Sequence, residues 1–471
     1  MSDENVVASA KIGGKKTADH LMKQNLEALG IENLTPVTPE VISRQATINI
    51  GAIGHVAHGK STVVRALTGV QTVRFSNEKQ RNITIRLGYA NAKIYRCSNP
   101  ECPAPACYCS YGSGKEDEPL CERVGCGGRL KLLRHVSFVD CPGHDVLMAT
   151  MLTGAAVMDA ALLLIAADNP CPMPQTREHL AAVDLMQLEH IIVLQNKIDL
   201  VPMDKCRQQY QEIRNFVART CARTAPVIPV SAQLRLNIDS LCETICNYIP
   251  IPERDFLSAP RMSIIRSFDT NKPGTAPEDI SGGVAGGTLL QGVLKLGDEI
   301  EIRPGHVVKE SDDTFKCYPL RSRVVSLYAE ENDLQYAVPG GLIGVGTRID
   351  PFLFRSDKLV GQVLGRRGTL PKVYSQVTIQ FNLLPRLIGT VDNTAVKPLM
   401  VNELVRINIG STTIGARVAN KQSEHVADLV LTLPICAVID EHVAISRRIN
   451  SNWRLIGFGD FKSGVECPID E

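Results

Sequence analysis

The chain has 471 residues, of which 44% are hydrophobic and 21% charged, so it can form several folded domains and is not a disordered chain. Its 51 basic residues nearly balance 50 acidic ones, and the formal charge of +1 excludes a globally basic coat, so any RNA binding must use local patches. Because no uncharged apolar run is long enough for a membrane span and the N-terminus lacks a signal-peptide core, we expect a cytoplasmic protein without membrane association.

Residues 1–44 are polar and aperiodic, and we interpret them as an N-terminal extension. Between 45 and 255, short apolar runs alternate with segments of helical period. This alternation predicts an α/β domain with a mostly parallel sheet and helices on both faces. The predicted strands are 48–53, 136–139, 160–166, 191–195 and 227–230, and the predicted helices are 144–158, 175–186, 205–221 and 238–248.

The proline-rich stretch 249–255 breaks this rhythm and predicts a linker. Beyond it, short valine-rich segments alternate with glycine turns, and no long helical pattern occurs. Such a texture is typical of antiparallel sheets that close into barrels. We therefore predict two antiparallel β-barrels, over 256–368 and 369–471.

Residues 54–61 fit the pattern G-x-x-x-x-G-K-[ST] directly after the predicted strand 48–53. Glycine in such a loop lets backbone N–H groups surround phosphate oxygens, Lys60 can reach the β- and γ-phosphates, and the Ser61 hydroxyl can ligate Mg²⁺. The alternative is a glycine turn that happens to carry Lys-Ser, which the strand and helix context disfavours. The predicted nucleotide-binding residues here are Gly54, Val56, Ala57, His58, Gly59, Lys60, Ser61 and Thr62.

Three further segments each follow a predicted strand. A carboxylate in D-C-P-G can support Mg²⁺ while its glycine N–H meets a γ-phosphate. A carboxylate in N-K-I-D can accept from both guanine donors and so reject adenine. The third segment is the tripeptide S-A-Q. Taken singly, D-C-P-G could be an ordinary turn, the Asp of N-K-I-D a helix N-cap, and S-A-Q is a weak pattern, but the three occur in order at strand ends. The candidates are Asp140, Gly143, Asn196, Lys197, Asp199, Ser231, Ala232 and Gln233.

Residues 81–85, R-N-I-T-I, include Thr84. Its hydroxyl can ligate Mg²⁺ and bond a γ-phosphate, although Thr84 could equally be an ordinary strand threonine. Four basic residues crowd the stretch 74–86 with one acid, Glu78; they are Arg74, Lys79, Arg81 and Arg86. A charge run is usually a solvated face. Tyr89 follows and could stack on a base, so Asn82 and Tyr89 are the candidates if this segment contacts RNA.

Six of the 15 cysteines lie between 97 and 126. Without export signals, such a cluster indicates a metal site or free thiols before disulfides. Cys97 and Cys102, and likewise Cys121 and Cys126, have four residues between them, a spacing compatible with tetrahedral zinc. We predict these four as ligands, with Cys107 or Cys109 as substitutes, and free surface thiols as the alternative.

With all five guanine-nucleotide motifs in order, the chain resembles a translational GTPase. Within that superfamily it is similar to the gamma subunits of eukaryotic and archaeal translation initiation factor 2, over about 45–465. The segments that carry the resemblance include GHVAHGKST (54–62), RNITIRLGYANAKIY (81–95), QNKIDLV (195–201) and NWRLIGFG (452–459). The resemblance implies a P-loop GTPase domain followed by two barrels, with GTP or GDP and Mg²⁺ as ligands.

The resemblance further implies that the chain delivers methionyl initiator tRNA to the small ribosomal subunit, within a heterotrimer with alpha and beta subunits. It implies that Ser61, Thr84 and Asp140 hold Mg²⁺ and that His144 orients the hydrolytic water. Arg74 or Arg81 could meet the developing charge, but we favour an arginine supplied by a partner, so we expect slow hydrolysis without an activating partner. Nucleotide-exchange factors are the other expected partners.

Several positions depart from related patterns. Elongation factors usually have Asp where Ala57 stands, an alanine that gamma subunits share, and Pro385 replaces a basic residue. Archaeal members have C-x-x-C pairs where this chain has wider spacings. Two alternatives remain open. A selenocysteine-type tRNA-specific elongation factor would add a C-terminal RNA-binding region, and a nucleotide-dependent metabolic GTPase would need no aminoacyl-tRNA.

Overall fold

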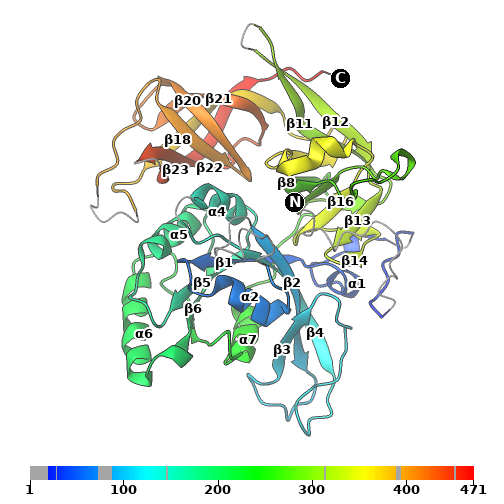
Figure 1. Cartoon of the computed structure of the whole chain (residues 1–471), viewed down its shortest axis with the longest axis vertical. Helices are drawn as coiled ribbons and strands as arrows, with labels where there is room; N and C mark the ends of the chain where they lie inside the picture. Colours follow the sequence, from blue (N-terminus) through cyan, green and yellow to red (C-terminus); the bar gives the residue numbers. More distant parts are fainter. Residues whose placement is uncertain are drawn as a thin grey trace. The chain divides into compact units, whose positions relative to one another are not determined.

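The computed structural model describes residues 20–27, 29–72, 87–144, 147–311, 314–388, 394–449 and 452–470 (Figure 1). The chain divides into two compact units. The first unit comprises Met1–Phe256 together with Tyr328–Leu342, and the second comprises Leu257–Leu327 and Ile343–Glu471. Among the residues within these ranges, no helix is both long enough and apolar enough to cross a bilayer.

In the described part of the first unit, a sheet runs in the order β3-β2-β4-β1-β5-β6-β7. Strands β4, β1, β5, β6 and β7 are parallel, and the β2–β3 hairpin extends the edge in the antiparallel direction. All five predicted strands are present. The bounds are β1 Ile48–Gly54, β2 Gly88–Cys97, β3 Tyr108–Gly112, β4 Leu130–Asp140, β5 Ala160–Ala166, β6 His190–Asn196 and β7 Val227–Pro229.

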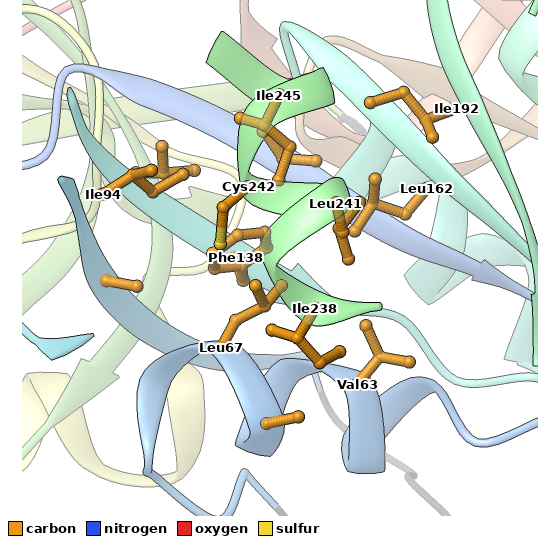
Figure 2. Packing of buried hydrophobic residues seen from close by; sticks show 14 of the residues in the cluster. Val63, Leu67, Ile94, Phe138, Leu162, Ile192, Ile238, Leu241, Cys242 and Ile245 are labelled. Carbon is orange, nitrogen blue, oxygen red and sulfur yellow. The ribbon is translucent and has the colours of Figure 1, made fainter. Parts of the chain in front are cut away.

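Helices cover both faces of this sheet, as the continuously apolar strands require. One face packs against α2 (Lys60–Thr68) and α7 (Ile238–Tyr248), whose apolar side chains surround Phe138 of β4 (Figure 2). On the other face, a Cβ on Gly51 of β1 would lie 2.1 Å from the Met158 sulfur. The other α-helices in the described part of this unit are α1 (Pro39–Ile42), α4 (Met148–Ala155), α5 (Pro174–Leu185) and α6 (Met203–Val217).

The second unit is built from antiparallel strands, as predicted. Its first sheet has the order β12-β11-β17-β8-β9-β16-β13-β14, and the last strand of this order belongs to the first unit. The bounds are β8 Arg261–Phe268, β9 Val284–Gln291, β11 Glu299–Lys309, β12 Phe315–Arg323, β13 Ser326–Ala329, β14 Asn332–Asp333, β16 Ile343–Gly346 and β17 Val363–Arg366. The second unit also contains the short strand β10 Leu294–Lys295, whereas the short strand β15 Tyr336–Ala337, like β14, belongs to the first unit.

The C-terminal part of the second unit is a closed barrel in the order β18-β21-β20-β19-β22-β23. Its strands alternate as a barrel requires: Val377, Ile379 and Phe381 are buried, whereas Gln376 and Gln380 are exposed. The predicted fold class is therefore confirmed. The bounds are β18 Val373–Leu383, β19 Leu404–Ile409, β20 Thr412–Lys421, β21 Val426–Cys436, β22 His442–Ile449 and β23 Asn452–Glu466.

Candidate nucleotide site and cysteine cluster

The loop between β1 and α2 has the backbone form that its glycines permit. Gly54 and Gly59 have φ of 133° and 90°, and Ala57 between them has φ of 62°. A Cβ on Gly54 would lie 2.5 Å from the Leu164 carbonyl oxygen, and one on Gly59 would lie 2.3 Å from Nδ2 of Asn196. Glycine is therefore required at both positions for two reasons: the backbone has positive φ, and there is no space for a Cβ atom.

Lys60, the first residue of α2, turns its ammonium back over this loop. The side chain is 6% exposed, and Nζ donates to the carbonyl oxygens of Gly54 at 3.0 Å and His55 at 2.8 Å. Burial lowers the pKa of Lys60 to about 8, while the charge of Asp140 acts in the opposite direction. A buried ammonium held only by neutral carbonyls favours an incoming anion such as phosphate. Ser61 and Thr62 follow in the first turn of α2, and both are half-buried.

Asn196 joins three of the predicted segments. Its side chain is 2% exposed at the end of β6. Nδ2 donates to the His58 carbonyl oxygen at 2.9 Å, and Oδ1 accepts from the Ala232 N–H at 3.2 Å. The phosphate loop, N-K-I-D and S-A-Q are thus fixed to one another by a single amide. Lys197, the next residue of N-K-I-D, forms an ion pair with Asp168, with 3.3 Å between Nζ and Oδ2.

The base-reading candidates differ in exposure. Asp199 lies in a short 3-10 helix, η3 (Ile198–Leu200), and is exposed, as is Gln233. Ser231 is fully buried, and its hydroxyl accepts from the Leu234 N–H at 3.3 Å. An exposed carboxylate beside a buried loop can meet a base that enters from solvent.

The D-C-P-G segment lies against the phosphate loop. Asp140 ends β4 and is fully buried. A Cβ on Gly143 would lie 2.4 Å from Nζ of Lys60 and 2.9 Å from the Val56 nitrogen. His144 follows directly and is exposed. Asn82 and Thr84, with the basic residues of 74–86, lie outside the described residues, and Tyr89 is half-buried in β2.

The structure also shows residues that the sequence patterns did not identify. From α5, Nδ1 of His179 accepts from the Gly54 N–H at 3.0 Å, and Oε1 of Gln175 accepts from the Val56 N–H at 3.4 Å. Burial lowers the pKa of His179 to about 3, so the ring stays neutral and can accept. A Gln and a His four positions apart on one predicted helix share a face, and this spacing was the available signal.

His58, predicted to bind nucleotide, directs its ring into the protein. The side chain is 0% exposed, and Nδ1–H donates to the Leu164 carbonyl oxygen at 2.9 Å. Burial lowers its pKa to about 4. Its side chain therefore braces the loop against β5, and its carbonyl accepts from Asn196.

The four cysteines chosen from their spacing lie together. The sulfurs of Cys97, Cys102, Cys121 and Cys126 are all within 4.8 Å of one another, the one group of three or more potential metal ligands found in the described ranges. Asn99 Nδ2 lies 3.4 Å from the Cys126 sulfur, and Arg123 Nη1 lies 3.5 Å from that of Cys102. Cys107 and Cys109 are not in this group. Four soft sulfur donors without a carboxylate suit zinc.

Comparisons with known proteins agree along nearly all of the chain. Family models match for the elongation factor Tu GTP binding domain at 45–251, elongation factor Tu domain 2 at 282–365, and the initiation factor eIF2 gamma C-terminal domain at 375–461. Eukaryotic translation initiation factor 2 subunit 3 of Drosophila melanogaster is 58% identical over 462 residues, covering 97% of this chain and 96% of that protein. The subunit gamma of Schizosaccharomyces pombe is 59% identical over 447 residues, covering 94% and 100%.

Two solved structures share the fold. A bacterial selenocysteine-specific elongation factor, EF-Sec, has a TM-score of 0.63 at 18% identity, covering 88% of this chain and 58% of that one. The elongation factor SelB of Methanococcus maripaludis, in complex with the GTP analogue GppNHp, has a TM-score of 0.63 at 19% identity, covering 89% and 80%. At these identities the likeness concerns the fold.

Proposed function

This chain belongs to the family of gamma subunits of eukaryotic translation initiation factor 2 and is a GTPase of translation initiation, and on that premise we propose that it binds methionyl initiator tRNA in its GTP state. It delivers this tRNA to the small ribosomal subunit and releases it after hydrolysis. The proposal includes a cytoplasmic heterotrimer with alpha and beta subunits, together with GTPase-activating and nucleotide-exchange factors. The observation that carries the nucleotide-binding part of the proposal is Asn196, which joins the phosphate loop to the base-reading segments.

The phosphate groups of GTP fit the environment of Lys60. Among the described residues, the Lys60 ammonium donates to the carbonyl oxygens of Gly54 and His55, and the charge of Asp140 acts on it as well. Burial removes the water that would solvate the ammonium, and the negative charge of a phosphate would favour its charged form. Backbone N–H groups of the loop and of Gly143 add neutral donors. Asp199 reads the guanine edge.

Magnesium fits the oxygen donors beside the loop. We expect the Ser61 hydroxyl and the Asp140 carboxylate to hold it, with Thr84, because Mg²⁺ prefers hard oxygen ligands. When bound, the ion neutralises charge on the β- and γ-phosphate oxygens. The protein's own part is to fix those donors before the nucleotide arrives: Asp140 is fully buried at a strand end, and Ser61 is held in a helix turn.

His144 is proposed to orient the hydrolytic water. It follows Gly143, which packs against Lys60, the residue proposed to bind the γ-phosphate, and this proximity supports the role. We place the aminoacyl end of the tRNA beside Asn82 and Tyr89. An arginine supplied by a partner completes the charge stabilisation, since in-trans arginines add about 10³–10⁵ to such rates.

The cysteine cluster is proposed to hold one zinc ion through Cys97, Cys102, Cys121 and Cys126. The four sulfurs already lie within 4.8 Å of one another, and N–H donors from Asn99 and Arg123 reach two of them, as donors beside metal-bound ligands do. Elemental analysis of chelator-washed protein should give one zinc per chain. Cys121→Ser should lose it, while Cys109→Ser, in the same insertion but outside the cluster, should retain it. Zinc-free wild-type protein would contradict the assignment.

Filter binding with charged initiator and elongator methionyl-tRNA tests the main proposal. The chain, with alpha and beta subunits present, should retain initiator tRNA with GTP and much less with GDP, and should retain little elongator tRNA in either state. Equal retention of both tRNAs, or no dependence on the nucleotide, would overturn it. A metabolic GTPase would retain neither tRNA, and a selenocysteine-type factor would not select the initiator.

A further inference from the structure

The buried carboxylate at the end of β4 has a partner that none of the nucleotide motifs includes. Oδ2 of Asp140 accepts a hydrogen bond from the Thr72 hydroxyl at 2.6 Å. Asp140 is 0% exposed and Thr72 is 6% exposed. A hydroxyl–carboxylate distance in this range is typical of a charge-assisted bond, which is stronger than a neutral one.

Three backbone segments meet at this contact. Thr72 lies shortly after Gly69, which ends α2 in the left-handed conformation, and is the last described residue before 73–86. Gly88, at the start of β2, is the register partner of Asp140. A Cβ on Gly88 would lie 2.8 Å from the Thr72 Cβ and 3.4 Å from the Asp140 Cβ. The glycine therefore makes room for the threonine to reach the carboxylate.

The Thr72 hydroxyl makes a different kind of contact from the hydroxyl of Thr68 in α2. The hydroxyl of Thr68 donates to the Val64 carbonyl at 2.8 Å and accepts from the Val70 N–H, so it serves its own helix end. The Thr72 hydroxyl instead bridges from the end of one element to the end of a strand 68 positions away. Such a contact fixes the rotation of the carboxylate as well as its position.

We propose that Thr72 is a positioning residue for the magnesium-supporting carboxylate: by holding Oδ2 of Asp140, it orients the group that supports Mg²⁺ beside the nucleotide. This inference rests on the proposed GTP and magnesium site. Groups that orient a ligand in this way usually change metal affinity by about 10- to 100-fold when removed. The inference concerns metal-dependent nucleotide retention and requires no contact between Thr72 and nucleotide.

The test compares Thr72→Val, which removes the hydroxyl at nearly constant volume, with Thr72→Ser, which keeps it. Dissociation of a fluorescent GDP analogue from the full-length protein is followed while free Mg²⁺ is varied with a chelator. For Thr72→Val we expect the Mg²⁺ concentration that half-maximally slows dissociation to rise about tenfold or more. Thr72→Ser should stay near wild type. In excess chelator all variants should release the nucleotide at similar rates.

Thr68→Val is the matched control, because it removes a buried hydroxyl four positions away that does not touch Asp140. It should leave the magnesium midpoint unchanged even if it lowers the unfolding temperature. If Thr72→Val does not fold, Thr72→Cys is compared with Thr72→Ser instead, since a thiol is a weaker hydrogen-bond donor than a hydroxyl and of similar size. The cysteine variant must then show the shift.

A wild-type midpoint in Thr72→Val, equal shifts in the valine and serine variants, or an equal acceleration in chelator would overturn the inference. If wild-type protein bound no guanine nucleotide, or released it at a rate independent of Mg²⁺, the proposed function itself would fail. The two failures are distinguished by the wild-type curve alone.

Discussion

Asn196→Asp should loosen nucleotide binding without enlarging any side chain. The amide Nδ2 donates to the His58 carbonyl oxygen at 2.9 Å in a site that is 2% exposed. In the variant, a carboxylate oxygen takes the place of that donor and faces the carbonyl. The contact to the Ala232 N–H can persist, because an oxygen still occupies the accepting position. The substitution therefore removes the link between the base-reading strand and the phosphate loop and places a negative charge beside the carbonyl.

The magnitude follows from the unsatisfied carbonyl. Leaving a buried acceptor without its partner costs about 1–3 kcal/mol. In the free protein the loop can move away and relieve that cost, but phosphate binding holds the loop in place. The penalty then falls on binding, and at about 1.4 kcal/mol per tenfold we expect the dissociation constant for GDP to rise about 5- to 150-fold.

Gln195→Glu supplies the control for general damage to β6. Gln195 is the preceding residue, also 2% exposed, and Nε2 donates to the Cys206 carbonyl and to Oε1 of Gln209, both at 2.9 Å. Both variants should unfold at lower temperature, but only Asn196→Asp should lose affinity in a calorimetric titration with GDP. A change within threefold in Asn196→Asp, or an equal loss in the control, would refute the reasoning.

Four further expectations concern single residues. Asp199→Asn should admit xanthine nucleotides, because it exchanges donor and acceptor edges; unchanged preference for GTP over xanthosine triphosphate in competition would contradict it. His144→Ala should keep GTP affinity but lose phosphate release in single turnover with the activating partner, and wild-type release would exclude it as the water-orienting group. His179→Asn, which keeps an acceptor near the place of Nδ1, should retain GDP longer than His179→Gln, by about fivefold for a bond worth about 1 kcal/mol; the reverse order of dissociation rates would argue against that bond. Because the pKa of Lys60 is lowered to about 8 in the free protein and a phosphate favours the charged form, nucleotide binding should take up a proton near and above pH 8 and weaken as the pH rises further, which calorimetry in buffers of different ionisation enthalpy measures.

The parts of the fold that could be predicted are those with a local signature. The predicted strand 160–166 coincides with β5, since a strand buried on both faces is a continuous apolar run. The cysteine spacing likewise anticipated the group at Cys97, Cys102, Cys121 and Cys126, because a short loop returns two thiols to nearly the same place. The β2–β3 hairpin was not predicted, since an edge hairpin of mixed polarity lacks both signals.

Within the site, sequence reasoning found the residues of the motifs but not those that support them. His58 belongs to the phosphate-loop pattern, yet its ring braces β5. His179 and Thr72 belong to no pattern, and the residues they contact lie 125 and 68 positions away. Such contacts depend on which elements the folded sheet brings together. A short stretch of sequence contains only one of the two residues in each contact, so it cannot predict the pair.

The segment Tyr328–Leu342 shows the same limit on a larger scale. The sequence assigns it to the first barrel, but the chain places it in the first unit, where Gln45 donates to the carbonyls of Val338 at 2.7 Å and Gly340 at 2.9 Å and accepts from the Val338 N–H at 3.0 Å. A Cβ on Gly340 would lie 2.3 Å from the Thr47 carbonyl oxygen, so the glycine is required there in addition to its φ of 95°. The sequence P-G-G at 339–341 predicts a turn, but it does not indicate that the turn packs against residues 45–47. Gln45 and Thr47 directly precede β1, so residues nearly 300 positions further along the chain fix the backbone that enters the phosphate-loop strand. A contact between residues so far apart in the sequence leaves no local pattern from which it could be predicted.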